Sequence, residues 1–563
     1  MSAAWSLAER DRALARAERE GVDLLVVGGG ITGAGVLRDA ASRGLRTLLV
    51  ERDDFASGTS SRSSKLVHGG MRYIGEGALG VTRESCRERD LLRAQNPNLI
   101  RPLPFLFPAY RESKTPLWQV RGALWVYHAL ANFRSSAASR MLAPVEVLEF
   151  CRDLRRDGLR GAGLYTDAQV DDARLVLETL KSARSLGAEA VNHAELVAFE
   201  HGADQRISGA RVRDRRTGRS HTIAVQVVVN AAGPSLDRVR DLDRKRSAPE
   251  LRPAKGVHLV IPRQRIHSQG AVVFEAADGR HLFLVPWEDV TLLGTTDSFS
   301  EELDEPVARI DEVHYLLSAA NRAFPKAALT TNDLRAVFAG VRPLAGAQDE
   351  SKPSSSVSRE HRIYRDPSGL LSVAGGKLTT FRAMAERIVA RVIVRLPRSR
   401  RAELGPSLTR DLPLRSDDFD AKSLGDELIQ RFGISMRSAD HLVRNYGASS
   451  ESLLAEVPRS LWEPIGSSAF LYAEIPWCMA RECPVTLCDL LERRMRLAIF
   501  AESHALPQLP RIVQVAAEAA GWDAARSENE AADYAQTVRR RYQIMPPARS
   551  DEASGSGAKV AAA

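Results

Sequence analysis

The feature that most constrains the fold is the segment DLLVVGGGITGAGVLRDAASRGLRTLLVE, residues 23–51. An apolar run is followed by a glycine-rich turn, a helical pattern and a second apolar run that ends at Glu51. Gly28, Gly30 and Gly33 fit the spacing G-x-G-x-x-G. Gly28 permits the tight turn, Gly30 lets the backbone approach a pyrophosphate, and Gly33 lets the helix pack closely on the strand. The segment therefore predicts a β-α-β unit of an α/β domain.

The same segment predicts a dinucleotide ligand, with a tight turn that binds nothing as the alternative. The N-terminus of the helix offers free N–H groups and the positive end of the dipole to phosphates. Glu51 stands where an acid would bind the ribose. Residues 369–393, GLLSVAGGKLTTFRAMAERIVARVI, again read as strand, glycine pair and helix. A cofactor contacted by pieces so far apart suits a flavin better than a nicotinamide nucleotide.

Length and composition set the outer limits. At 563 residues the chain exceeds what one hydrophobic core usually serves, so we expect two or three domains. Hydrophobic residues make up 44% and charged residues 27%, as in ordinary soluble globular proteins. No apolar run approaches the roughly 20 residues that span a bilayer. Residues 1–20, MSAAWSLAERDRALARAERE, lack an apolar signal core, so we expect a cytoplasmic protein.

The cysteines predict neither a disulfide framework nor a metal site. Five in a chain of this length point to a reducing compartment. Cys478, Cys483 and Cys488 are evenly spaced, but structural zinc normally uses tighter ligand pairs. We expect buried thiols in a helical domain.

The net charge of +8 and the pI of about 9.3 indicate an anionic partner. Charge alone leaves a substrate, a membrane surface and nucleic acid open. An aromatic content of 6% and scattered arginines do not favour nucleic acid, which we do not expect as a partner.

A series of further segments is specific when taken together. Along residues 20–395 they are GGGITGAGVLRDAASRG, GTSSRSSKLVHGGMRY, VDDARLVL, NAAGP, KGVHLVIP, FLVPWEDVTLLGTTD, FAGVRPL, SREHRI and GGKLTTFR. With these segments the chain resembles the FAD-dependent glycerol-3-phosphate dehydrogenase family of the bacterial respiratory type. Residues 472–500, YAEIPWCMARECPVTLCDLLERRMRLAIF, resemble the C-terminal helical domain of that family.

The resemblance implies an α/β fold with a Rossmann-like FAD-binding domain of the glutathione-reductase and glycine-oxidase kind. An antiparallel-sheet substrate domain would be inserted into it, and a helical domain would follow. The implied parts are an N-terminal helix (1–20), a discontinuous FAD-binding domain (21–395) with the substrate domain at about 96–165 and 258–340, a linker (396–414), the C-terminal helical domain (415–545) and a disordered tail (546–563).

The resemblance also implies which residues bind the cofactor, FAD. They are Gly28, Gly30, Gly33, Glu51, Thr59, Ser60, Ser63, Ser64, Lys65, Gly233, Gly376, Lys377, Leu378, Thr379 and Thr380. Hydroxyl and backbone N–H groups suit a diphosphate because they donate hydrogen bonds without requiring one in return. The helix that follows Lys377 would stabilise reduced flavin through its dipole. A polar turn without a ligand is the alternative for residues 58–73.

The implied substrate is glycerol 3-phosphate, and a second set of residues would hold it. The expected substrate-binding residues are Arg72, Tyr73, His68 and Arg359, and the expected catalytic residues are His258, Arg342 and Lys377. Arginine suits a phosphate dianion through its bidentate fork. Lys377 would fix the substrate oxygen or stabilise negative charge near the flavin.

Oxidation of a secondary alcohol requires loss of the hydroxyl proton and transfer of the C2 hydride, which flavin N5 would accept. His258 is the expected base because imidazole titrates near neutrality. His68 is its rival, and a histidine that merely hydrogen-bonds a neighbouring group is the alternative interpretation.

The electron acceptor and the location follow from the same resemblance. A membrane quinone would take the electrons, and the protein would attach peripherally to the anionic inner face of the cell membrane, with a homodimer as a further option. The alternatives are a glycerol-3-phosphate oxidase that makes hydrogen peroxide, a basic flavoprotein that binds tRNA, and a flavin-bearing protein without turnover. Such oxidases usually carry an extra insertion in the FAD domain, and no long insertion is evident, which favours the dehydrogenase.

Overall fold

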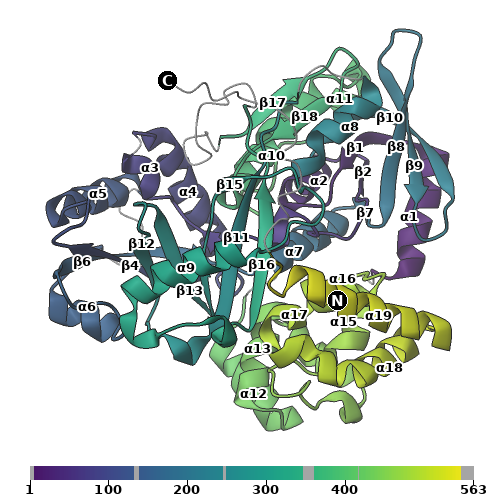
Figure 1. Cartoon of the computed structure of the whole chain (residues 1–563). Helices are drawn as coiled ribbons and strands as arrows, with labels where there is room; N and C mark the ends of the chain where they lie inside the picture. The colour runs from purple at the N-terminus through teal and green to yellow at the C-terminus, as the bar shows by residue number, and fades with distance from the viewer. Residues whose placement is uncertain are drawn as a thin grey trace, which may run out of the picture.

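The chain folds around two β-sheets and a separate group of helices (Figure 1). The computed structural model describes residues 5–75, 77–131, 139–244, 249–346, 360–415 and 418–546. Figure 1 places the helices α12 to α19 together at one side of the molecule, beneath both sheets. Within the described ranges, no helix combines the length and apolar content that crossing a bilayer requires.

The first sheet contains the predicted β-α-β unit. Its order is β17–β18–β10–β1–β2–β7, parallel from β18 to β7, and the hairpin β8–β9 continues from β10. Its strands are β1 (Val22–Val27), β2 (Thr47–Val50), β7 (Glu189–Val191), β8 (Ala194–His201), β9 (Ile207–Asp214), β10 (Ser220–Asn230), β17 (Arg362–Arg365) and β18 (Leu371–Ala374).

Helices cover both faces of this sheet, which explains why β1 is an unbroken apolar run. Leu24 and Val26 pack into the cluster that contains residues of α2 (Ile31–Ser42), α7 (Asp172–Ser185) and α10 (Phe381–Ile393). Leu25 and Val27 face the other way, towards α1 (Leu7–Glu20). Because successive side chains of a strand point to opposite faces, both sets of apolar residues are needed.

The second sheet is almost entirely antiparallel, with the order β15–β11–β14–β13–β12–β4–β6–β3; β16 also pairs with β11, and β5 with β6. Only β12 and β4 pair in parallel. Its strands are β3 (Leu66–Val67), β4 (Arg101–Tyr110), β5 (Arg140–Leu142), β6 (Leu159–Gln169), β11 (Ala254–Pro262), β12 (Ala271–Glu275), β13 (His281–Trp287), β14 (Val290–Gly294), β15 (Ser298–Phe299) and β16 (Ala336–Arg342).

Five helices flank the second sheet. These are α3 (Arg72–Gly75), α4 (Leu79–Gln95), α5 (Leu117–Leu130), α6 (Pro144–Phe150) and α9 (Ile310–Ala323). Gly163 of β6 shows how closely α5 lies on the sheet, because an added Cβ would stand 2.8 Å from atoms of both Val120 and Leu124. The short helix α8 (Leu236–Asp243) belongs to the first sheet and follows β10.

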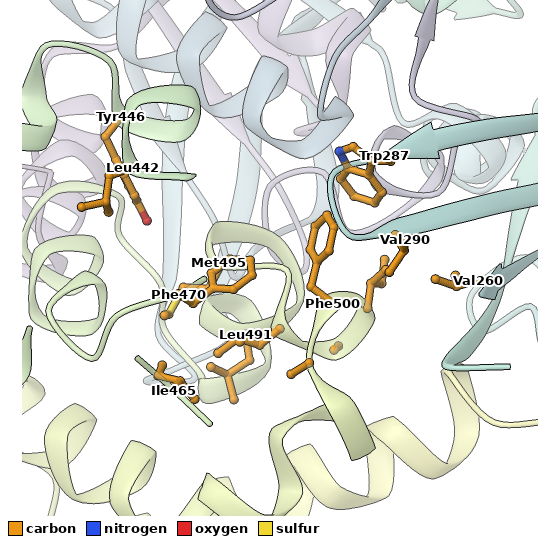
Figure 2. Packing of buried hydrophobic residues seen from close by; sticks show 14 of the residues in the cluster. Val260, Trp287, Val290, Leu442, Tyr446, Ile465, Phe470, Leu491, Met495 and Phe500 are labelled. Carbon is orange, nitrogen blue, oxygen red and sulfur yellow. The ribbon is translucent and has the colours of Figure 1, made fainter. Parts of the chain in front are cut away.

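The C-terminal helices share a hydrophobic core with the second sheet. They are α12 (Ala421–Phe432), α13 (Met436–Tyr446), α14 (Ser449–Glu456), α15 (Glu474–Arg481), α16 (Leu487–Asp489), α17 (Leu497–Phe500), α18 (Leu509–Ala520) and α19 (Ala524–Arg541). Figure 2 shows Trp287, from the β13–β14 hairpin, facing Phe500 of α17, and their ring centroids are 4.5 Å apart. This common core holds the helical region against the sheet.

The segment expected as a linker packs along the first sheet's helices. Arg38 of α2 donates hydrogen bonds to the carbonyl oxygens of Leu412 and Pro413, and the Ser407 hydroxyl donates to Asp39. A short helix, α11 (Arg398–Ala402), lies within it. Most of the predicted tail, residues 547–563, lies outside the described residues.

The cysteines discussed above have separate neighbours. Cys478 lies 3.5 Å from the Tyr446 hydroxyl, and the Cys488 sulfur is 3.5 Å from Thr537 Oγ1. Cys483 is fully buried beside Asn192.

A buried imidazole also joins the helical region to the second sheet. His441 of α13 lies 2.9 Å from a carboxylate oxygen of Glu474 in α15 and 3.8 Å from one of Glu288 in the β13–β14 turn. Burial alone would lower the pKa of His441, but the two carboxylates outweigh it and raise the pKa to about 9. At neutral pH the imidazolium therefore links Glu474 to the hairpin.

This ion pair predicts a pH-dependent stability. A raised folded-state pKa means that the contribution is fully present below the unfolded histidine pKa of about 6.5 and is lost as the pH rises through about 9. We expect His441→Gln to lower the melting temperature most near pH 6, by an amount equivalent to about 2–3 kcal/mol, and progressively less towards pH 9. Thermal melts across this range measure the difference, with His314→Gln on the exposed side of α9 as the control. A difference in melting temperature that stays constant across this pH range would contradict the role of the His441 ion pair.

Candidate functional site

A cavity of about 1050 Å³ extends from the carboxyl ends of β1 and β2 to the C-terminal helices. Ligands of open α/β sheets bind at this edge, where the strand order reverses. Of the residues predicted to bind the cofactor, those in its wall are Gly28, Gly30, Glu51, Thr59, Ser60, Ser63, Gly233, Gly376, Lys377 and Leu378. Gly33, Ser64, Lys65, Thr379 and Thr380 are not among its lining residues.

The glycines of the first turn have the geometry that their spacing predicts. Gly28 has φ +111°, a conformation that disfavours other residues. A Cβ at Gly33 would stand 1.9 Å from the Gly28 carbonyl oxygen, so the helix could not lie this close to the turn. At Gly30 an added Cβ would lie 3.0 Å from Ser60 Oγ, which itself accepts a hydrogen bond from Ile31 N.

Glu51 ends β2 at the cavity wall, where a ribose-binding acid is expected. One carboxylate oxygen accepts from Gly29 N at 2.6 Å and the other from Asp53 N at 2.9 Å. Burial raises the pKa of Glu51, and these two N–H groups oppose the rise by stabilising the anion. The carboxylate thus also fixes the backbone of the glycine turn.

The hydroxyl groups of residues 58–73 are held by the protein itself. Thr59 Oγ1 donates to the Val341 carbonyl at 2.5 Å, and Ser63 Oγ donates to Asp172 at 2.7 Å. Ser64 Oγ lies 2.9 Å from His258 Nε2. These hydroxyls are predicted to bind a diphosphate. In the structure they also anchor the segment to three other parts of the chain.

Lys65 does not line the cavity, although its predicted role in FAD binding would require this. Its fully buried ammonium lies 2.8 Å from both oxygens of Asp172 and donates to the Ser61 carbonyl at 2.7 Å. Burial lowers the pKa of Lys65 to about 8, while Asp172 opposes the shift. Because its donors are used inside the protein, we assign Lys65 to the structure of the segment.

The second glycine-rich turn meets residues 58–73 directly. Thr379 Oγ1 accepts from His68 N at 3.0 Å and lies 3.1 Å from the His68 carbonyl. The Lys377 ammonium is 3.6 Å from the centroid of the Tyr73 ring, a cation–π distance. The structure therefore brings Lys377 and its turn to His68 and Tyr73, from which they are far apart in sequence.

His258 lies in β11, opposite Gly294 of β14 and Phe338 of β16. Its ring stacks on Phe338 with centroids 4.8 Å apart, and a Cβ at Gly294 would come within 2.8 Å of it. Burial, followed by the charges of Lys65 and Arg342, holds the pKa of His258 well below its usual value. Among the described residues, no group forms a hydrogen bond with its buried Nδ1.

Arg342 ends β16 beside the same histidine and is held in a fixed orientation. Its guanidinium donates to Asp297 Oδ1 at 3.0 Å and to Thr295 Oγ1 at 3.1 Å. Sequence reasoning missed the role of Gly256, where an added Cβ would stand 2.4 Å from the guanidinium. Gly256 therefore provides the room in which this side chain lies across β11.

Two of the predicted arginines cannot be placed in the site. Arg72 is the first residue of α3, but its side chain lies outside the described part. Arg359 belongs to residues 347–359, which also lie outside it. Both assignments remain predictions.

The C-terminal region supplies part of the cavity wall, which the sequence did not reveal. The lining residues from this region are Cys488, Asp489, Glu492, Arg493, Thr537 and Arg541. Three of them lie in or beside a π-helical turn, η9 (Leu490–Arg494). Arg493 and Arg494 both form ion pairs with the buried Asp54, which follows β2 of the first sheet. The sequence signal for this role was the run of charged residues in LLERRMRLAIF. A helix at the surface would not carry charged residues among so many apolar ones.

Asp172 joins three segments at the floor of the site. It accepts hydrogen bonds from Ser63 N and Oγ at 2.9 and 2.7 Å, and it pairs with Lys65 and with Arg496 at 2.8 and 3.1 Å. Asp172 is fully buried at the first turn of α7. The helix dipole there adds to the stabilisation of its negative charge.

The cavity fits a flavin dinucleotide. A glycine turn, a helix N-terminus and Glu51 lie at one end, and Gly376 and Lys377 lie at the other. Backbone N–H donors suit a diphosphate, and the same space extends from the first glycine turn to Lys377. The fold and the cavity thus define a dinucleotide-binding oxidoreductase of the flavoprotein class.

Comparison with known proteins identifies the family. Residues 23–391 match the family described as FAD dependent oxidoreductase, and residues 407–527 match the C-terminal domain of alpha-glycerophosphate oxidase. The chain is 34% identical over 526 residues to the aerobic glycerol-3-phosphate dehydrogenase of Staphylococcus aureus (strain USA300), covering 92% of this chain and 94% of that protein.

Solved structures agree with this result. The glycerol-3-phosphate dehydrogenase from Bacillus halodurans, complexed with FAD, superposes with a TM-score of 0.77 at 30% identity, covering 95% of this chain and 98% of that one. Glycine oxidase from Geobacillus kaustophilus has a TM-score of 0.51 at 20% identity, covering 67% of this chain and 96% of that one, and shares the fold. The chain belongs to the FAD-dependent glycerol-3-phosphate dehydrogenase family, and its cofactor is FAD. The predicted fold class and cofactor are confirmed.

Gly30→Ala tests the first turn. The new methyl group would crowd Ser60 Oγ at the cavity wall, so we expect FAD binding to weaken by about 1–3 kcal/mol. The ratio of flavin to protein absorbance after dialysis measures the loss. Gly80→Ala is the matched control, because an added Cβ there meets nothing within 4 Å. Equal retention of flavin in the two variants would contradict the role of Gly30.

Acid precipitation should release the flavin from the wild type, since we predict that FAD is held without a covalent bond.

Asp172→Asn tests the junction beneath the site. Loss of the carboxylate leaves the Lys65 ammonium buried without its partner, while Arg496 keeps Asp171 at 3.2 Å, so we expect a cost of about 3–5 kcal/mol in the free energy of unfolding. Denaturant titration measures this loss, with Asp204→Asn on an exposed turn as the control. Lys65→Met in the Asp172→Asn background should restore part of the stability. A double variant no more stable than Asp172→Asn alone would show that the ion pair is not the cause.

Proposed function

We propose that the protein oxidises sn-glycerol 3-phosphate to dihydroxyacetone phosphate with bound FAD and that a membrane quinone accepts the electrons. The observation that carries the proposal is the similarity to aerobic glycerol-3-phosphate dehydrogenase over 92% of the chain. It includes the C-terminal region, which forms part of the cavity wall.

The residues beside the cavity are suited to a phosphorylated alcohol. The Arg342 side chain is 19% exposed, and Asp297 and Thr295 orient it. The Lys377 ammonium lies over the ring of Tyr73, at the end of residues 58–73. Arg342, together with the predicted Arg72 and Arg359, would bind the phosphate dianion, because guanidinium groups form bidentate hydrogen bonds with it. Lys377 and His68 would contact the substrate oxygens.

His258 is the group best suited to take the hydroxyl proton. Its depressed pKa keeps the imidazole neutral at pH 7, so that a ring nitrogen can accept a proton. In the tautomer in which Nε2 donates to Ser64 Oγ, the lone pair of Nδ1 is available. When bound, FAD supplies the acceptor for the hydride that leaves C2 of the substrate. The chain's own task is to orient the substrate and to remove the proton.

A quinone acceptor implies attachment to the membrane that contains it. We therefore propose a protein that binds peripherally to the inner face of the cell membrane through its basic surface. Glycerol-3-phosphate oxidase, with oxygen as the acceptor, is the alternative, since the C-terminal family match carries an oxidase description. Anaerobic mixing with sn-glycerol 3-phosphate should bleach the flavin absorbance, and glycerol should not. Re-oxidation by a soluble quinone analogue much faster than by oxygen supports the dehydrogenase; the reverse order favours the oxidase.

Removal of the base and of a phosphate ligand should have different kinetic effects. His258→Ala should slow flavin reduction by roughly 10²–10⁴-fold with a nearly unchanged substrate affinity, because base assistance is needed only in the transition state. Arg342→Gln should chiefly raise KM, because the phosphate is bound in both ground and transition states.

Anaerobic stopped flow measures both effects, and His314→Ala on the surface of α9 is the control. Flavin reduction at the wild-type rate in His258→Ala would move the base to His68 or Lys377.

A further inference from the structure

A buried polar network borders the turn of residues 68–73, which carries His68 and Tyr73. Its members are Asp167 of β6, Arg89 of α4 and Tyr127 of α5, and all three side chains are almost completely inaccessible to solvent. Figure 1 shows α3, α4 and α5 together at one end of the molecule, beside β4 and β6. None of the three network residues lines the cofactor cavity, and none has a role in the proposed oxidation.

One carboxylate oxygen of Asp167 joins the members of this network. Asp167 Oδ1 accepts hydrogen bonds from the Tyr127 hydroxyl and from Arg89 Nη1, both at 2.6 Å. It also accepts from Gly69 N, in the turn, at 3.1 Å. Burial raises the pKa of Tyr127 well above its usual range, so the hydroxyl remains a donor. Because hydrogen bonds to an ionised group are stronger than neutral ones, this oxygen is a firm anchor for the backbone of the turn.

The pairing of β3 with β6 explains why the turn needs this anchor. Val67 of β3 pairs with Ala168 of β6, so the next pair along the two strands would join His68 to Asp167. The ladder ends before that pair, and His68 N donates instead to Thr379 Oγ1 at 3.0 Å. The turn is therefore held between two parts of the chain, by the Asp167 carboxylate on one side and by the second glycine-rich turn on the other.

Close packing around two glycines transmits the position of this backbone to Tyr73. An added Cβ at Gly69 would stand 2.4 Å from the Tyr127 hydroxyl. Gly70 has φ +77°, and an added Cβ there would stand 2.4 Å from the Tyr73 ring. The Lys377 ammonium lies over that ring at 3.6 Å from its centroid. A shift of the turn would therefore move the ring of Tyr73 relative to Lys377.

A network of this kind contributes position more than stability. Replacement of a buried ion pair by apolar residues of similar volume often leaves the free energy of unfolding unchanged or raises it. Hydrogen bonds among buried polar groups instead select one arrangement of the segments that they join. Asp167, Arg89 and Tyr127 come from a strand and two helices, and the segment to which they are joined is the turn, through Gly69 N.

We propose that Asp167, supported by Arg89 and Tyr127, is a positioning residue that sets the turn of residues 68–73 for substrate binding. The inference rests on the proposed function, in which His68 and Tyr73 contact the substrate. Asp167 acts through the backbone of the turn and lies outside the cavity wall. Loss of the network should therefore weaken substrate binding, while FAD, which other segments of the cavity wall hold, stays in place.

Tyr127→Phe is the mildest test, because it removes one hydroxyl and keeps the ring. Anaerobic stopped flow of the FAD-loaded full chain gives the dissociation constant of sn-glycerol 3-phosphate and the limiting rate of flavin reduction. We expect the dissociation constant to rise about two- to tenfold, with a smaller change in the limiting rate and an unchanged FAD content. Tyr534→Phe is the matched control, because Tyr534 is also buried and its hydroxyl donates to the His504 carbonyl at 2.7 Å. It should bind the substrate as the wild type does.

A double variant separates positioning from stability. Asp167→Leu alone leaves the Arg89 guanidinium with one carboxylate, that of Asp90, so we expect a lower melting temperature. Arg89→Met/Asp167→Leu removes both charges, and the melting temperature should recover. Gly69 N then keeps only the Tyr127 hydroxyl, at 3.1 Å, so the affinity for the substrate should stay about two- to tenfold below that of the wild type. Recovery of the affinity together with the melting temperature would show a purely structural role and overturn the inference. Loss of FAD from the double variant would overturn it as well.

Reduction of the wild type separates this inference from the proposed function. A wild type that sn-glycerol 3-phosphate reduces, together with variants that bind this substrate as tightly, removes the inference and leaves the oxidation intact. A wild type that this substrate does not reduce removes the proposed function, and the substrate role of the turn with it. Reduction of the wild type, with weaker substrate binding in Tyr127→Phe and in Arg89→Met/Asp167→Leu, is the result that we expect.

Discussion

The carboxylate of Asp172 is the contact on which the shape of the site depends. It receives hydrogen bonds from Ser63, an ammonium from Lys65 and a guanidinium from Arg496, which come from the polar stretch 58–73 and from the C-terminal region. All of these charges are buried and compensate one another, with Asp171 as a further partner of Arg496 at 3.2 Å. The segment that borders the cofactor cavity is therefore tied to the C-terminal region through the Asp172 side chain.

A second buried carboxylate repeats this arrangement on the neighbouring side of the cavity. Asp54, soon after β2, binds both Arg493 and Arg494. Consecutive residues of an α-helix point about 100° apart, and the π-helical turn at residues 490–494 changes the direction of these side chains so that both reach one acid. Glu492 and Arg493 then line the cavity itself. The helical region is consequently a wall of the cofactor site, which explains why its sequence accompanies the FAD-binding part in the family.

The local features of the site could be predicted from the sequence, and its long-range contacts could not. The glycine turn and Glu51 lie within one β-α-β unit, so their spacing alone indicates their positions. The family resemblance implied that Lys65 binds FAD, but the partner of its ammonium in the structure is an acid 107 residues away. The cavity contacts of Glu492 and Arg541 depend in the same way on how distant helices dock, and Gly256 is recognisable only once the path of Arg342 is known.

The ion pair of Lys65 also has a consequence for the chemistry. Ser63 and Lys65 both turn towards Asp172, and Ser64, between them, turns the other way and meets Nε2 of His258. The same ammonium stands over the Phe338 ring, 5.2 Å from its centroid, and that ring stacks on the imidazole. Burial is the main cause of the low pKa of His258, and the charges of Lys65 and then Arg342 lower it further. One buried ion pair thus positions the hydrogen-bond partner of the proposed base and helps to keep that base neutral. A residue outside the cavity wall in this way contributes to the protonation state on which the oxidation depends.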